Sequence, residues 1–224
     1  MVHEHILIVD YGSQYTQLIA RRIREQHVFC RIIPPQRFTV AELTGLKPKG
    51  VILSGGPASV YQAGAPLPDR ATLEQGIPTL GICYGMQAMA TLLGGEVKAT
   101  GQREYGKAML AVDEPDGLFH ETKPRFVSWM SHGDAVVTLP PGARVLAHTD
   151  STTAAAIADP VRKLYGLQFH PEVAHTEEGV KIVRNFLFRL CGCAGEWTMQ
   201  SFVDEQIAQI RQTVGKAHVV LGLS

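Results

Sequence analysis

The sequence predicts an α/β protein with an open, mostly parallel, doubly wound sheet that is flanked by helices. In the first half of its 224 residues, short β-branched runs alternate with longer helical patterns, which is typical of parallel strands joined by crossover helices. In the second half, short strand-like segments are separated by Pro, Gly and Asp turns. These segments indicate mixed or antiparallel strands that extend the same sheet.

The expected elements of the first half alternate regularly. Strands are predicted at residues 6–10, 28–34, 49–55 and 77–83. Helices are predicted at residues 14–26, at a short segment that ends with 71–76, and at 84–93. The fourth strand, IPTLGIC, is apolar almost throughout, as expected for a strand buried on both faces. A helix follows it directly, so the chain must turn sharply between these two elements.

The second half is expected to hold five strand-like pieces and a helix that packs on the sheet. The pieces lie at residues 106–113, 125–140, 143–149, 154–159 and 163–171, and the helix lies at 177–191. After CGCAGE the pattern restarts with an amphipathic helix at 198–215. Its apolar residues at helical spacing are Val203, Ile207, Ile210 and Val214.

A change of pattern near residue 195 indicates a domain boundary. We expect one domain over residues 1–195, followed over 196–224 by a linker helix and the first strand of a second, truncated domain. A capping box from Ser201 to Asp204 is expected in that helix. The final segment, KAHVVLGLS at 216–224, is the expected strand.

Composition excludes several classes of partner. With 21 basic and 21 acidic residues the chain is formally neutral, so we expect neither nucleic acid nor an anionic membrane as a partner. The sequence shows no basic and apolar leader and no apolar run that approaches a membrane span. The four cysteines give no obvious disulfide framework, and we expect a soluble, cytoplasmic protein. They are Cys30, Cys83, Cys191 and Cys193.

The sharp turn in LGICYGMQ places Cys83 between the fourth strand and the helix that follows. Glycines at positions 81 and 85 leave room for a tight turn, and the helix N-terminus favours a thiolate over a thiol. The motif is nevertheless short, and most free cysteines fill a core. Taken alone, it favours a core cysteine over a nucleophile.

A base and an acid at LQFHPEV, residues 167–173, change this balance. In an extended segment, residues two apart face the same way, so His170 and Glu172 would project side by side from a strand end. An imidazole oriented by a carboxylate can accept the proton of a cysteine. An isolated His and Glu at a strand end would more often be solvent-exposed, but both this pair and Cys83 are expected at carboxyl ends of strands.

The glycines of LSGGPAS, residues 53–59, follow the third predicted strand. There the backbone can turn an N–H towards a ligand, as an oxyanion hole requires. An ordinary turn or a phosphate loop is the alternative, although the segment lacks the lysine of a P-loop and does not match GxGxxG.

The motifs SGGP, GICYGMQ and FHPE, in that order, resemble the class I, or triad, glutamine amidotransferase family. This resemblance implies a flavodoxin-like core and a Cys-His-Glu glutaminase that passes ammonia to a synthase. It makes Cys83 the nucleophile, His170 the general base and acid, and Glu172 the orienting carboxylate. It also assigns the oxyanion hole to the amides of Gly56 and Tyr84.

The same resemblance implies the residues that surround the substrate. Gln87 and the backbone around Ser131 and His132 are expected to line a glutamine pocket, although Gln87 could equally lie on the surface of its helix. Residues 103–105, Arg-Glu-Tyr, match the family without an assigned role. The CxC of the C-terminal cysteines has no further ligands nearby, and no metal is expected.

Within the family the chain resembles the GMP synthases, through residues 8–25, 128–134, 173–179 and the tail from 191. The resemblance implies a glutaminase half-reaction on L-glutamine. ATP and Mg²⁺ are expected only in the intact enzyme, where ATP pyrophosphatase and dimerisation domains of the same polypeptide aminate XMP to GMP. Two alternatives stay open: a γ-glutamyl hydrolase or cysteine peptidase of similar fold, and a non-catalytic docking domain of a synthase.

Overall fold

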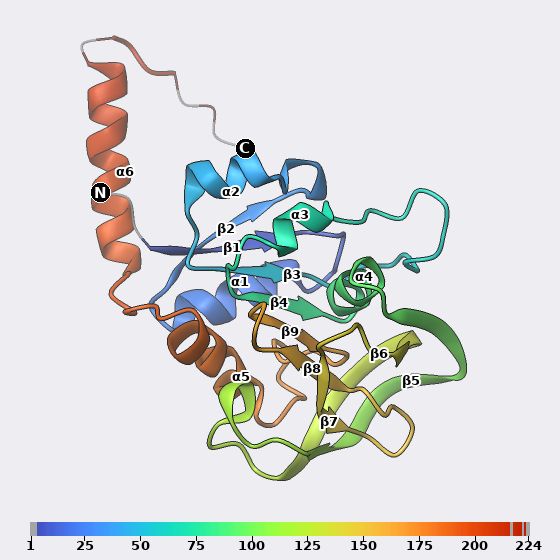
Figure 1. Ribbon diagram of the computed structural model, residues 1–224. Coiled ribbons are helices and arrows are strands. Elements are labelled where there is room, and N and C mark those ends of the chain that lie inside the picture. Colours follow the sequence, from blue (N-terminus) through green and yellow to red (C-terminus); the bar gives the residue numbers. More distant parts are fainter. Residues whose placement is uncertain (1–3, 216, 221, 223–224) are drawn as a thin grey trace.

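A single mixed sheet organises the protein, as the computed structural model in Figure 1 shows. The structure describes residues 4–215, 217–220 and 222, without the side chains of residues 100–103 and 205. The nine strands of the described part lie in the order β2-β1-β3-β4-β9-β8-β7-β5-β6. They are β1 (His5–Val9), β2 (Phe29–Ile33), β3 (Gly50–Leu53), β4 (Thr79–Ile82), β5 (Glu96–Val112), β6 (Arg125–Thr138), β7 (Arg144–His148), β8 (Ala156–Asp159) and β9 (Leu164–Leu167).

The sheet has a parallel half and an antiparallel half. Strands β2, β1, β3, β4 and β9 pair in parallel. Strands β8, β7, β5 and β6 continue the sheet from β9 through antiparallel pairings. This arrangement confirms the predicted α/β fold, including the antiparallel strands expected in the second half.

Helices cover both faces of the parallel half (Figure 1). Ile6 and Ile8 of β1 belong to the same core cluster as residues of α1 and α5, whereas Leu7 and Val9 pack in the cluster that contains α2, α3 and α4. This alternation follows from the two-residue period of a strand. The helices are α1 (Thr16–Glu25), α2 (Val40–Leu46), α3 (Arg70–Leu73), α4 (Tyr84–Leu92), α5 (Gly179–Asn185) and α6 (Met199–Val214), with shorter turns at Pro35–Arg37, Gly117–Phe119 and Phe186–Leu190.

Helix α2 was not predicted from the sequence. Thr39 caps its N-terminus, because the Thr39 side chain accepts a hydrogen bond from the Glu42 amide, and Lys47 in the left-handed conformation ends it. At seven residues, Val40–Leu46 is too short to show a clear helical period. The Thr39-x-x-Glu42 spacing of a capping box was the available signal.

Strand β5 begins at Glu96, ten residues before the predicted start at 106. It forms a long antiparallel hairpin with β6, and the pairing shifts register between Ala99 and Glu104. After this shift, Glu104 lies opposite His132 and Tyr105 lies opposite Ser131. The irregular pairing therefore places residues 104 and 105, which match the family without an assigned role, beside the predicted pocket residues Ser131 and His132.

Two predictions for the C-terminal segment were wrong. The capping box of α6 uses Thr198 as N-cap with Ser201 as its partner, not Ser201 with Asp204, because the Thr198 side chain already accepts the Ser201 amide. No strand is present at 217–220 or 222, and the other residues of the predicted strand at 216–224 lie outside the described part. A strand needs a hydrogen-bonded neighbour, and the Val219 and Val220 side chains are 67% and 95% exposed.

Candidate active site

The predicted nucleophile lies in a strained turn between β4 and α4. Cys83 has φ 50° and ψ −106°, a conformation that L-residues rarely adopt. A Cβ atom at Gly81 would lie 2.5 Å from the Met86 amide nitrogen, and one at Gly85 would lie 2.3 Å from the Leu53 carbonyl oxygen. Only glycine fits at these two positions, and the strand-to-helix turn depends on both.

The neighbouring parallel strand brings in the histidine. Because β9 pairs with β4, the Cys83 amide donates to the Leu167 carbonyl at 2.7 Å, and His170 follows three residues later. The His170 Nδ1 atom lies 2.8 Å from Glu172 Oε1, and both side chains are buried. Since a carboxylate only accepts hydrogen bonds, Nδ1 carries a proton and Nε2 is the nitrogen left for Cys83.

Two buried histidines near Cys83 differ in charge. Burial lowers the pKa of His170, but hydrogen bonds to Cys83 and Glu172, together with their charges, raise it to about 10. Burial lowers the pKa of His132, and the nearby carboxylate of Glu104 only partly opposes this effect. At neutral pH, His170 is therefore an imidazolium and His132 is neutral.

The predicted oxyanion donors line the same cleft as Cys83. Gly56 follows β3, and a Cβ atom there would lie 2.8 Å from the Tyr11 carbonyl oxygen, so glycine allows two backbone segments to approach closely. Tyr84 is the first residue of α4, where amides lack acceptors within the helix. Within the part of the chain that the structure describes, neither amide donates to another group. Both are therefore free to bind a ligand.

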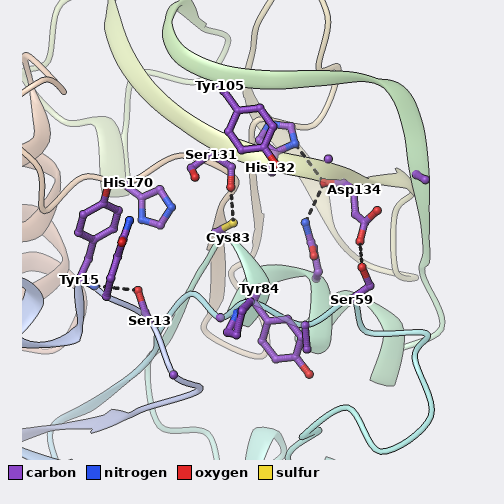
Figure 2. A pocket seen from close by; sticks show the side chains of 18 of the residues that line it. Ser13, Tyr15, Ser59, Cys83, Tyr84, Tyr105, Ser131, His132, Asp134 and His170 are labelled. Atoms are coloured by element: carbon purple, nitrogen blue, oxygen red, sulfur yellow. Dashed lines mark hydrogen bonds between the residues drawn. The ribbon is translucent and has the colours of Figure 1, made fainter.

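All of the predicted site residues except Glu172 line one cleft of about 820 Å³ (Figure 2). Glu172 lies behind His170 and is 1% exposed. The Ser131 carbonyl lies 3.7 Å from Cys83 Sγ, and the Gln87 side chain is 3% exposed, so Gln87 is not on the surface of its helix. The predicted residues that share the cleft are Gly56, Cys83, Tyr84, Gln87, Ser131, His132 and His170.

Sequence reasoning missed part of this cleft. The Tyr15 ring lies edge-on to the His170 ring, with centroids 5.1 Å apart, and Asp134 accepts hydrogen bonds from Ser59 and Tyr61 across the cleft. Tyr15 lies in the loop after β1, at the carboxyl end of a parallel strand next to β3. Polar and aromatic residues directly after the first strand were the available signal, because ligands bind where the strand order reverses.

Two further features bear on the class of site. Among the described residues, no group of three or more His, Cys, Asp or Glu side chains is placed to hold a metal ion. No helix in the described ranges is long and apolar enough to cross a membrane. The side chain of Arg103 lies outside the described part, whereas Glu104 and Tyr105 of the same segment are described.

The sequence profile "Glutamine amidotransferase class-I" matches residues 7–190. The chain belongs to the class I glutamine amidotransferase family. Among its amidotransferase relatives, the "GMP synthase [glutamine-hydrolyzing]" of Heliobacterium modesticaldum is 52% identical over 222 residues. The alignment covers 99% of this chain and 43% of that relative. The enzyme of the same name from Thermosynechococcus vestitus is 52% identical over 219 residues, covering 98% of this chain and 41% of the relative.

Solved structures share the fold of this amidotransferase. A protein from Thermoplasma acidophilum, provisionally assigned as one subunit of a GMP synthase, superposes with a TM-score of 0.74 at 28% identity, over 92% of this chain and 98% of that one. A glutamine amidotransferase from Thermotoga maritima gives a TM-score of 0.67 at 19% identity, over 84% and 98%, and supports the fold alone. The chain spans only about two fifths of the length of the curated relatives named above.

Proposed function

We propose that this chain hydrolyses L-glutamine to glutamate and ammonia through a thioester on Cys83. The observation that carries the proposal is the junction of β4 and β9, where the strained Cys83 turn meets the buried His170–Glu172 pair. Nucleophile, acid–base group and orienting carboxylate are the three parts that covalent amide hydrolysis requires. The free amides of Gly56 and Tyr84 would supply oxyanion donors.

In the proposed reaction, the Cys83 sulfur attacks the side-chain amide carbon of glutamine. The oxyanion forms between the two amides, the C–N bond breaks, and His170 gives its proton to the departing ammonia. Water then attacks the thioester while His170 accepts one of its protons. The C–S bond breaks, the electron pair returns to sulfur, and glutamate leaves.

We further propose that the ammonia serves GMP synthesis in a larger assembly. The relatives that are about half identical to this chain are GMP synthases described as glutamine-hydrolysing, and this chain spans only part of them. The partner would carry ATP, Mg²⁺ and XMP, for which no site is proposed in this chain. The peptidase and docking-domain alternatives gain no support from these relatives.

Release of glutamate from glutamine by the purified chain tests the proposal. A glutamine-derived electrophile, 6-diazo-5-oxo-L-norleucine, is expected to label Cys83 alone. Burial raises the pKa of both Cys30 and Cys193 to about 11 and that of Cys191 higher still, so these thiols are poor nucleophiles at neutral pH. Mass spectrometry of the labelled peptides measures the selectivity.

The Cys83→Ala variant is expected to abolish both glutamate release and labelling. The matched control is Cys30→Ala, which removes a buried thiol from the opposite end of the parallel sheet and should keep both. Glutamate release that survives Cys83→Ala, or label spread over several cysteines, would contradict the proposal. Faster cleavage of γ-glutamyl peptides than of glutamine would indicate a γ-glutamyl hydrolase instead.

A further inference from the structure

Gln168 is a buried polar residue that the proposed reaction does not use. It follows β9 directly, the residue is 0% exposed, and its backbone N–H donates to the Ala155 carbonyl at 2.8 Å. Its side-chain Nε2 lies 3.6 Å from Cys83 Sγ in donor geometry. A buried amide aimed at a reactive sulfur calls for a chemical explanation, because apolar side chains would fill the same space without a polar cost.

Hydrogen bonding determines which end of the Gln168 amide faces the sulfur. Gln87 Nε2 donates to the Asp134 backbone carbonyl at 2.8 Å. Because a carbonyl oxygen only accepts hydrogen bonds, the side-chain nitrogen of Gln87, and not its oxygen, must face Asp134. The same Nε2 lies 3.2 Å from Gln168 Oε1. Gln168 therefore presents its oxygen to Gln87 and its N–H to Cys83. The orientation is set by a chain of bonds that begins at a backbone carbonyl.

We propose that Gln168 is a further catalytic residue, whose side-chain N–H donates a hydrogen bond to the Cys83 sulfur and stabilises it as a thiolate. The inference rests on the proposed function in taking Cys83 as the nucleophile. The sulfur carries negative charge before it attacks glutamine and again when the thioester breaks. An N–H donor in a buried site stabilises that charge on both occasions.

The position of Gln168 separates this role from substrate binding. Gln168 is absent from the residues that line the cleft, whereas Cys83 and Gln87 both line it. It approaches the sulfur from the strand side, and the neighbouring strand β4 leads into the Cys83 turn. Removing its N–H should therefore slow turnover without weakening the binding of glutamine.

The titratable groups around Cys83 come from several elements. His170 lies after β9 with Glu172 behind it, His132 lies on β6, and Tyr84 begins α4. All four are unchanged in variants at position 168. A difference between Gln168→Met and the wild type therefore reports the Gln168 amide and not the charges around it.

Ultraviolet titration of the thiolate tests the proposal on the full chain. The absorbance at 240 nm that disappears in a matched Cys83→Ala background measures the thiolate of Cys83. Gln168→Met keeps the bulk and removes the donor, and it should move the midpoint of thiolate formation upward by about one pH unit, because one hydrogen bond to a charged group changes an equilibrium by about tenfold or more. Gln168→Glu, of similar shape, should move it further, because it removes the donor and also places a negative charge beside the sulfur.

Kinetics with glutamine provide the second measurement. Gln168→Met should lower kcat about 10- to 100-fold and leave KM within about twofold, as expected for loss of a donor that acts on the reacting atom. The control is Gln75→Met, which removes an exposed amide whose hydrogen bond, among the described residues, goes to the Ala71 carbonyl of its own segment, and it should change neither value. Gln87→Met should raise the thiolate midpoint as well, because Gln168 is then free to rotate.

The outcomes are separable. An unchanged midpoint in a folded Gln168 variant would overturn the proposal. Loss of the native near-ultraviolet circular dichroism in both Gln168 variants would also overturn it, since the residue would then be structural. The titration needs no glutamine, so a wild-type chain that releases no glutamate would contradict the proposed function and still leave the role of Gln168 measurable.

Discussion

Replacing Gly85 with alanine should directly damage the turn that carries the proposed nucleophile, Cys83. A methyl group at position 85 would lie 2.3 Å from the Leu53 carbonyl oxygen, whereas ordinary contact begins at 3.4 Å, so the first turn of α4 and the end of β3 must separate by about 1.1 Å. Leu53 Cβ, at 2.7 Å, blocks the same direction. Both obstacles belong to the backbone or lie next to it, and neither can rotate away.

The expected cost of Gly85→Ala has two parts. Overpacking of a core by one methyl group costs about 1–3 kcal/mol, which in a protein of this size lowers Tm by about 2–4 °C for each kcal/mol. Cys83, the proposed nucleophile, lies two residues away, and a misplacement of about 1 Å at a catalytic group costs about 100-fold in rate. We therefore expect lower stability together with a fall in kcat.

Gly45→Ala is the matched control, because Gly45 also lies in a helix but nothing surrounds its missing Cβ within 4 Å. Alanine there should leave activity unchanged and stabilise the fold by about 0.5–1 kcal/mol. Thermal unfolding followed by circular dichroism measures the Tm of both variants. A coupled assay of glutamate release measures their kcat. A Gly85→Ala variant with the Tm and kcat of the wild type would refute the steric account of the turn.

Two further predictions concern titrating groups. The pKa of His170 is raised from 6.5 to about 10, so the contacts of the imidazolium stabilise the fold fully below pH 6.5 and less as the pH rises through 10. The difference in unfolding free energy between wild type and His170→Gln should shrink over this range in urea titrations, and a constant difference would contradict the assignment. Glu104→Ala should lower stability by about 1–3 kcal/mol, because it leaves the hydroxyls of Thr149 and Thr152 without their carboxylate. Equal urea midpoints would show that this network contributes nothing.

Much of the fold could be predicted because the parallel strands are short, apolar and fully buried. Strands β3 and β4 have every residue buried, and each lies within the segment predicted from its apolar run. The start of β5 could not be predicted, because Glu96–Ala99 lack an apolar run and pair only through the irregular register with β6. Pairing partners are a property of the whole sheet, and a local pattern does not carry them.

The site was predictable to the extent that its chemistry is local. Cys83 stands in a glycine-flanked turn, and His170 and Glu172 are two residues apart, so each motif is complete within a few positions. Gln168 stands two residues before His170, yet its contact with Cys83 spans 85 positions in the chain. Only the pairing of β4 with β9 brings these two residues together, and no periodicity in the sequence specifies this pairing.

The two histidines of the cleft show what a motif leaves undetermined. Both are nearly buried, and from residue type alone either could serve as the base. The Nδ1 atom of His170 lies 2.8 Å from a carboxylate oxygen of Glu172, which leaves Nε2 for Cys83. Both nitrogens of His132 face other oxygens, because Nδ1 lies 3.1 Å from the Asp134 carbonyl and Nε2 lies 3.2 Å from Glu104 Oε2. His132 therefore has no ring nitrogen left for Cys83, so in the proposed reaction we expect His170 to accept the cysteine proton and return it to ammonia. The contacts of both ring nitrogens, and not the residue type, distinguish the two histidines.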